Sequence, residues 1–188
     1  SRGYRELAPV AGVSVGAVSG AIKRLRSRGV IIGTRPRLKD FDAALSTFEL
    51  GYADRLRPRL QPARMTTGSQ SMDELRERIG KAFAQHPEAE LALSGELGAA
   101  VAGADLVASA ATIHTSWPYR RLLAGLRLKP SVTGEVTLLR RIGPVDVSPV
   151  VGRPALANPI LIRAELLVQG GERQLQAAHQ LLELIPRP

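Results

Sequence analysis

Two short helices are predicted at the N-terminus by the spacing of apolar residues. Apolar side chains within residues 5–11 fall at helical spacing, and Gly12 can adopt the left-handed conformation of a tight turn. Ser14 is placed to cap a second helix, which ends at Gly29. We expect the buried stripe of this second helix to consist of Val18, Ile22 and Leu25.

A hairpin and a third helix are predicted next. Residues 30–32 read as a strand, residues 33–37 as a turn and Leu38 as the start of the return strand. Asp40 can cap a helix that runs over about residues 41–56. The N-terminal part of the chain is therefore expected to fold as helix, turn, helix, hairpin and helix.

A domain boundary is predicted after this helix. Residues 58–71 are rich in Pro, Arg, Thr, Gly and Ser, a composition typical of an exposed linker or a loosely held strand. We therefore expect a first domain over residues 1–57, a linker over residues 58–71 and a second domain over residues 72–188.

The second domain is predicted to mix helices and strands, so the fold class is α+β. Its helices are expected at residues 72–85, 97–103, 118–125, 159–168 and 172–185. Its strands are expected at residues 90–96, 106–114, 126–128 and 135–141.

The positive charge is concentrated in the first third of the chain. The 188 residues carry a formal net charge of +9. Residues 1–65 hold 13 Lys and Arg against 5 Asp and Glu, whereas residues 66–188 hold 13 against 12. A basic segment in a chain that is otherwise near neutral favours a polyanion such as nucleic acid as its partner. A solvated basic surface is the alternative that charge alone leaves open.

Composition excludes several classes of protein. The chain has no cysteine, which excludes a disulfide scaffold, thiol catalysis and thiolate zinc sites. Its three histidines, His86, His114 and His179, are scattered singly, so we predict no metal site and no cofactor. It has no apolar run of about 18 residues and no secretory signal at its N-terminus. We expect a cytoplasmic, nucleoid-associated protein without membrane contact.

The second predicted helix suits the major groove of DNA. A helix can enter that groove when its exposed face is short-chained near its N-terminus and basic further along, where phosphates flank the groove. Small side chains would lie against base edges, and cations of the helix and of the hairpin tip would hold phosphates. The predicted DNA-binding residues are Ser14, Val15, Ala17, Ser19, Lys23, Arg24, Arg35 and Arg37. An amphipathic helix pair without a ligand is the competing interpretation.

Two further features bear on this prediction. Gly16 and Gly20 each cost the second helix roughly 1 kcal/mol relative to Ala, and close packing on DNA or on a neighbouring helix would explain them. The helix-turn-helix with its hairpin is the pattern of winged-helix bacterial regulators. A winged helix has one more helix ahead of residues 5–10, and only residues 1–3 precede that segment here. We therefore expect the sequence to begin inside a longer protein.

The order of the motifs resembles the AbiEi-like antitoxins of type IV toxin-antitoxin systems. The quoted pieces are Gly-Tyr-Ala-Asp-Arg-Leu-Arg-Pro-Arg-Leu at 51–60, Ser-Gly-Glu-x-x-Ala-Ala at 94–100, Leu-Arg-Leu-x-Pro at 126–130, Gly-x-Val-x-Leu-Leu-Arg at 134–140, Pro-Ile-Leu-Ile-x-Ala-Glu-Leu-Leu at 159–167 and Gly-x-x-Arg-x-Leu-x-Ala-Ala at 170–178. The resemblance implies a DNA-binding repressor of its own operon. It also implies a nucleotidyltransferase-like second domain that counters a nucleotidyltransferase toxin.

Catalysis by that second domain is not predicted. Nucleotidyl transfer needs a Gly-Ser turn for the triphosphate and paired carboxylates on the next strand for two metal ions. Ser94 and Gly95 have the reversed order, and residues 106–114 contain no carboxylate. Asp105 precedes that strand alone, and Glu135 and Asp146 lie in the later hairpin region. We therefore predict no catalytic residue.

Three functional hypotheses follow from the sequence. The first is a repressor that binds double-stranded DNA and acts as an antitoxin, with a nucleotidyltransferase-like toxin as its other partner. The second is a regulator or DNA-organising protein outside any toxin pair, whose second domain binds protein. The third is a nucleotidyltransferase with a DNA-targeting arm. The sequence leaves the operator and the oligomeric state open, since paired half-sites would fit a dimer or two monomers.

Overall fold

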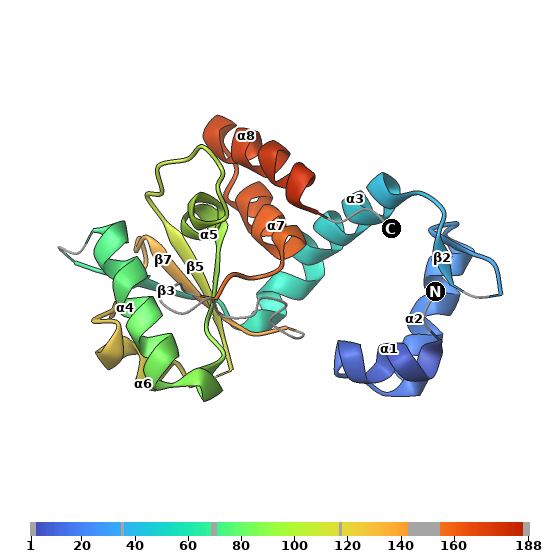
Figure 1. Ribbon diagram of the computed structural model, residues 1–188, viewed down its shortest axis with the longest axis horizontal. Helices are drawn as coiled ribbons and strands as arrows, with labels where there is room; N and C mark the ends of the chain where they lie inside the picture. The colour runs from blue at the N-terminus through green and yellow to red at the C-terminus, as the bar shows by residue number, and fades with distance from the viewer. Residues whose placement is uncertain (1–2, 35, 69–70, 117, 143–154, 186–188) are drawn as a thin grey trace. The chain divides into compact units, whose positions relative to one another are not determined.

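The computed structural model describes residues 3–34, 36–68, 71–116, 118–142 and 155–185 (Figure 1). It divides into two compact units, the first ending at Gly51 and the second spanning Tyr52–Ile185. The fold class is mixed α+β, as the sequence predicts. Of the predicted DNA-binding residues, Arg35 lies outside the described residues, as does Asp146.

The first unit begins with two helices joined by a tight turn. Helix α1 spans Tyr4–Ala11 and α2 spans Val15–Ser27. Gly12 ends α1 in the left-handed conformation with φ 64°, which a residue with a Cβ rarely adopts. The side chain of Ser14 caps α2 by accepting a hydrogen bond from the backbone N–H of Ala17 at 3.1 Å. The predicted pair of helices is therefore confirmed, with both predicted turn residues in their roles.

A small hairpin and a third helix complete the first unit. Strands β1 (Ile31–Ile32) and β2 (Arg37–Leu38) pair antiparallel, and α3 (Phe41–Gly51) follows. The carboxylate of Asp40 accepts a hydrogen bond from the backbone N–H of Ala43 at 3.0 Å, which caps α3 as predicted. The core of this unit consists of Ala8, Val18, Ile22, Val30 and Ile31.

The second unit is built on a five-stranded mixed sheet. Its strands are β3 (Ala63–Thr66), β4 (Ala92–Ser94), β5 (Ala111–Thr115), β6 (Lys129–Pro130) and β7 (Val136–Arg140). They lie in the order β4-β5-β7-β3-β6, and only β5 and β7 are parallel neighbours. Thr112 pairs with Ser94 on one side and with Thr137 on the other, so β5 lies inside the sheet, beside the buried polar cluster described below.

Helices cover both faces of this sheet (Figure 1). On one face, α4 (Met72–Gln85) and α6 (Tyr119–Gly125) pack onto an apolar core. On the other face, α7 (Pro159–Gln169) packs against α5 (Gly95–Val101) and α8 (Glu172–Gln180). A 3₁₀ turn, Leu181–Leu184, continues α8. The main core includes Leu75, Ile79, Leu93, Ile113, Leu122, Leu126 and Leu138.

The segment predicted as a linker is part of the second unit. The helix of α3 continues as a π-helix, Tyr52–Leu56, and a 3₁₀ turn, Arg57–Leu60. Strand β3 then inserts between β7 and β6, so residues 63–66 belong to the sheet and not to a free connection. The strand is too short and too polar to show an alternating pattern, because only Met65 within it is buried. The structural division therefore lies after Gly51.

Two other predicted strands are wrong in extent. The strand expected at 106–114 begins only at Ala111, because residues 106–110 form a loop in which the Val107 side chain is 84% exposed. The strand expected at 126–128 is absent, because these residues form the turn and the connection after α6, and β6 covers only Lys129–Pro130. Helix α5 begins at Gly95 rather than at residue 97.

Candidate nucleic-acid interface

The outward face of α2 is short-chained at its N-terminus. Val15, Ala17 and Ser19 are all exposed, whereas Val18 and Ile22 point into the core. The predicted contrast between a buried stripe and a small outward surface is therefore present. The hydroxyl of Ser14 accepts the capping hydrogen bond, so the structure assigns this residue a structural role at the same helix end.

Two glycines lie at the centre of that outward face. A Cβ added to Gly16 would meet only the Ser14 hydroxyl, at 3.8 Å, and one added to Gly20 would meet only the Arg24 guanidinium, at 3.4 Å. Among the described residues, no neighbouring helix packs on either position. Close packing inside the protein therefore does not explain these glycines.

Cations follow one turn further along α2. Lys23 and Arg24 are exposed, and neither is within 4.0 Å of a carboxylate in the part of the chain that the structure describes. The helix thus changes from small to basic along its length, the order that a major-groove helix needs.

The hairpin is tied to α2 by an arginine that sequence reasoning did not select. The Arg26 guanidinium donates a hydrogen bond through Nη2 to the carbonyl of Gly33 at 2.7 Å. Gly33 belongs to the turn between β1 and β2, so this contact fixes the hairpin tip to the helix. Arg37 is exposed on β2. The sequence showed Arg26 only as a cation in the last turn of the helix, and the contact depends on the fold of the hairpin.

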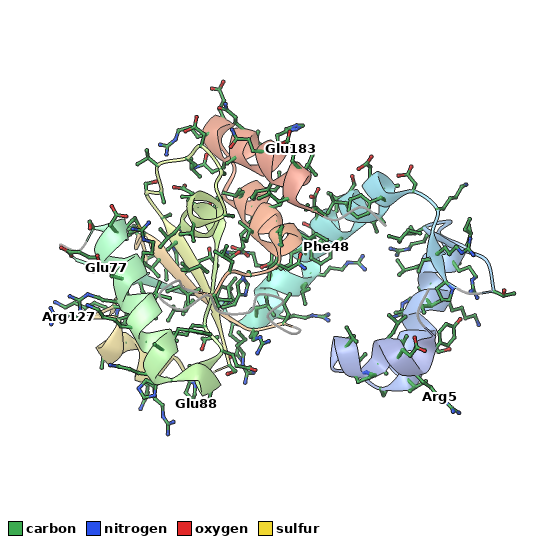
Figure 2. The ribbon with its side chains drawn as sticks, viewed as in Figure 1. Arg5, Phe48, Glu77, Glu88, Arg127 and Glu183 are labelled. Atoms are coloured by element: carbon green, nitrogen blue, oxygen red, sulfur yellow. The ribbon has the colours of Figure 1, made fainter. Side chains whose placement is uncertain are left out.

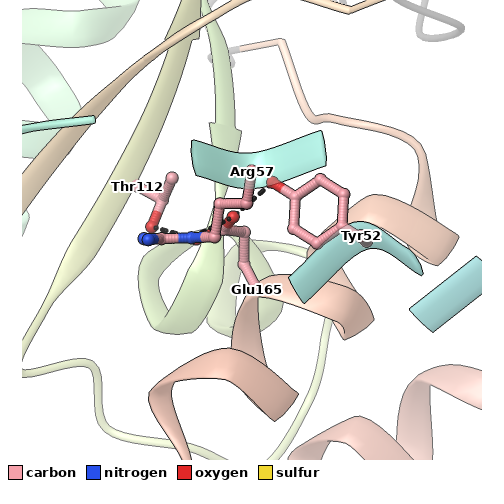
Figure 3. A network of polar contacts seen from close by, with 4 residues as sticks. All are labelled: Tyr52, Arg57, Thr112 and Glu165. Atoms are coloured by element: carbon pink, nitrogen blue, oxygen red, sulfur yellow. Dashed lines mark hydrogen bonds and ion pairs between the residues drawn. The ribbon is translucent and has the colours of Figure 1, made fainter. Parts of the chain in front are cut away.

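A separate polar cluster is buried in the second unit (Figure 3). Its centre is the carboxylate of Glu165 on α7, whose side chain is inaccessible to solvent. Arg57 donates to it from Nε at 2.9 Å, Thr112 on β5 donates from its hydroxyl at 3.3 Å, and the Tyr52 hydroxyl also donates to it. Burial, followed by the negative charge of Glu165, raises the pKa of Tyr52 above its ordinary value. Tyr52 therefore stays protonated and serves as a donor.

Two buried polar side chains beside this cluster have no side-chain hydrogen-bond partner among the described residues. They are His114, which is 1% exposed, and Ser94, which is fully buried. Burial lowers the pKa of His114 to about 4, against an opposing effect of the Glu165 charge. His114 is therefore neutral near neutral pH.

This cluster lies beside Ser94 and Gly95, where a nucleotidyltransferase would bind the triphosphate and two metal ions. Ser94 and Gly95 join β4 to α5, and β5 beside them carries Thr112 and His114 on the face toward Glu165. Two metal ions would need paired carboxylates there. The carboxylate that is present, Glu165, is instead paired with Arg57. We assign the cluster a structural role, which is to hold the residues after α3 against α7 and β5.

The other carboxylates considered in the sequence lie elsewhere. Glu135 accepts hydrogen bonds from the backbone N–H and hydroxyl of Thr67. Although partial burial opposes it, this hydrogen bonding lowers the pKa of Glu135 to about 2. Asp105 is exposed in the loop before β5. The described residues contain no group of three or more His, Asp or Glu side chains that could hold a metal ion.

Comparison with known protein families finds a match over most of the chain. The family model of transcriptional regulators described as AbiEi antitoxins of type IV toxin-antitoxin systems matches residues 37–185. The match begins at β2, so α1 and α2 precede it. No curated protein and no solved structure matches the chain significantly. Within the described residues, no helix has the length and apolar character needed to cross a membrane.

Proposed function

Because the chain belongs to the AbiEi family of transcriptional regulators, the antitoxins of type IV toxin-antitoxin systems, we propose that it binds operator DNA and represses its own operon. The observation that carries this proposal is the outward face of α2, where exposed small residues at the N-terminus are followed by unpaired cations. This face precedes the matched region, so it supports DNA binding independently of the family match.

In the proposed complex the first unit acts as a winged helix. Val15, Ala17 and Ser19 lie against base edges in the major groove, and Lys23 and Arg24 hold the flanking phosphates. Arg35 and Arg37 of the hairpin contact the backbone or the minor groove beside it. Because small side chains make few hydrogen bonds to bases, we expect DNA shape to contribute much of the specificity.

The second unit is proposed to counter a nucleotidyltransferase toxin. The order of elements from β4 to β5 supports a nucleotidyltransferase-like architecture. Strand β4 leads through Ser94 and Gly95 into α5, and β5 follows. The ion-paired Glu165 in place of paired carboxylates supports a role in binding or regulation. A gene for a nucleotidyltransferase-like protein beside this one is the expected genomic context. Its absence would favour a regulator or DNA-organising protein outside any toxin pair.

The salt dependence of operator binding tests the docking. Since each phosphate contact releases counterions, Lys23→Ala and Arg24→Ala should each weaken binding and lower the slope of log affinity against log salt by about one unit. The measurement is a titration of promoter DNA by fluorescence anisotropy at several salt concentrations. Arg76→Ala is the matched control, because Arg76 is an exposed arginine on α4, paired with Asp73. Unchanged affinity and slope in both α2 variants would refute the proposed docking.

A further inference from the structure

A groove lies between α4 and α6 in the second unit. Its volume is about 520 Å³, within the range of small-molecule sites. It belongs to the face of the sheet opposite to the Glu165 cluster, so it is distinct from the site described above. The lining residues that the argument uses are Glu74, Glu77, Arg78, Lys81, Arg121 and Arg127.

The cations that α4 contributes to this groove are unpaired. Glu74 precedes Arg78 by four residues and Glu77 precedes Lys81 by four, a spacing that favours ion pairs along a helix. Neither cation lies within 4.0 Å of a carboxylate of any described residue. Positive charge on the groove wall is therefore available to an anion.

Arg127 occupies a backbone position at which glycine is usual. It follows the C-terminus of α6 with φ 53°, and the backbone N–H of Leu128 donates to the carbonyl of Leu123 at 2.9 Å. This is the helix-ending arrangement in which the left-handed residue is ordinarily glycine. An arginine there carries conformational strain, and its exposed side chain lies beside Glu77 at the rim of the groove (Figure 2).

Gly125 keeps the groove open. A Cβ added at this last residue of α6 would meet no heavy atom within 4 Å, so a larger side chain there would extend into free space. The position therefore offers a substitution that fills the groove without a clash in the fold.

We propose that this groove binds a nucleoside polyphosphate. Arg78, Lys81, Arg121 and Arg127 hold the phosphate chain, and Glu74 and Glu77 accept hydrogen bonds from the ribose hydroxyls. These two carboxylates interrupt the cations, so the groove offers no continuous positive track for a nucleic-acid backbone, which opposes a duplex as the occupant. A docked protein needs exposed apolar anchors, but the groove's Leu122 and Leu126 are 2% and 0% exposed. Among the described residues, no Phe, Tyr or Trp lines the groove, and the imidazole at its edge, His86, contacts Glu88 at 3.3 Å, so discrimination between bases is expected to be weak.

Calorimetric titration of the full chain with ATP, CTP, inorganic triphosphate and adenosine tests the proposal. ATP and CTP should bind with affinities within about threefold of each other, because no Phe, Tyr or Trp among the groove's described residues can stack on the base. Inorganic triphosphate should bind more weakly, because it lacks the ribose, and adenosine should not bind measurably. Absence of nucleotide binding at millimolar concentration, or binding of single-stranded oligonucleotides alone, would overturn the proposal.

Variants separate ligand binding from folding. Arg127→Gly should lower ATP affinity about tenfold or more, consistent with loss of a charge-assisted contact, while the melting temperature stays equal or rises because strain is relieved. Lys81→Ala should weaken binding similarly, and Gly125→Leu should abolish it. Arg120→Ala is the matched control, since Arg120 is an exposed neighbour on α6 that does not line the groove.

The same titrations distinguish this groove from the proposed DNA interface. Lys23→Ala combined with Arg24→Ala should retain full ATP affinity, because both residues lie in the first unit. Equal ATP affinity in the wild type and in the Arg127→Gly, Lys81→Ala and Gly125→Leu variants would place the nucleotide elsewhere and refute the assignment.

Discussion

Gly16 is the residue of α2 whose identity local structure explains least. It lies in the first turn of a helix that glycine destabilises, and its added Cβ would contact only the Ser14 hydroxyl at 3.8 Å. A surface that must approach a ligand closely is a reason to keep the side chain absent. Close approach of DNA would explain the glycine. A substitution of Gly16 should therefore change the stability of the protein and its affinity for DNA in opposite directions.

Gly16→Ala should stabilise the protein and weaken operator binding. The added methyl group restricts the unfolded chain and favours the helix, so the unfolding free energy should rise by about 0.5–1 kcal/mol. The same methyl group should lower affinity for promoter DNA, measured by anisotropy, because it stands on the docking face. Gly80→Ala in α4 is the control, since a Cβ at Gly80 meets nothing within 4 Å and the residue lies outside the interface. Equal DNA affinity for Gly16→Ala and wild type would argue against close approach.

His114 should make the protein sensitive to mild acid. Its pKa is about 4 in the folded state against an ordinary 6.5, so the unfolded chain binds the proton more readily. The stability that the protein gains from keeping His114 neutral is complete above about pH 6.5 and is lost as the pH falls toward 4. Between about pH 7 and pH 5 the unfolding free energy should fall by roughly 2 kcal/mol from this group.

Chemical denaturation of wild type and His114→Gln at both pH values measures this effect. The variant removes the titrating group, so the part of the pH dependence that comes from His114 should disappear. Glu165 and Arg57, the charged groups that act on His114, are unchanged in the variant. The prediction fails when both proteins lose the same stability over this interval.

At the scale of elements, the hairpin depends on α2 for its position. Two strands of two residues each make too few backbone hydrogen bonds to be stable alone. The Arg26 guanidinium stabilises the hairpin by a charged hydrogen bond to the Gly33 carbonyl. The side chain of Ile31 on β1 is buried in the core of the first unit. The orientation of the hairpin is therefore a property of the helix and the hairpin together.

Arg26→Ala should loosen the hairpin while α2 remains folded. Hydrogen exchange of the backbone amides in β1 and β2 should become faster by about tenfold, the equivalent of roughly 1.4 kcal/mol, because the turn loses its donor from α2. Amides in the middle of α2 should keep their protection, which serves as the internal control. Arg26→Lys should restore part of the protection, since lysine also donates to a carbonyl. Unaltered exchange in the alanine variant would mean that the hairpin holds its position without this contact.

Elements with a strong local signal were predicted closely, and elements defined by their neighbours were not. Helix α4 was predicted at its observed residues, 72–85, because it has a regular apolar period and two acidic residues in its first turn. Strand β3 fell in a segment read as an exposed linker or a loosely held strand, because its place is decided by pairing with β7 and β6 and not by its own composition. The apolar residues 106–110 were read as strand, although their backbone pairs with no strand among the described residues.

At the scale of the whole molecule, charge and family evidence fall on different units. Most of the net positive charge lies in residues 1–65, and the family match covers residues 37–185. The second unit, Tyr52–Ile185, lies entirely inside the matched region. The first unit overlaps that region only from residue 37 to Gly51. The antitoxin family therefore rests mainly on the second unit, and the proposed DNA contact rests on α2 and the hairpin of the first.

The caps and turns of the first unit, the small-to-basic order along α2, the α+β class and the family could all be predicted from the amino-acid sequence, because each depends on residues close together in the chain. The folded structure was needed to show that Arg26 holds the hairpin, that Glu165 is paired with Arg57 across more than a hundred residues, and that Arg127 lies at the rim of a groove beside α4. These contacts join segments whose separation along the chain carries no local signal, and burial and strand pairing bring them together.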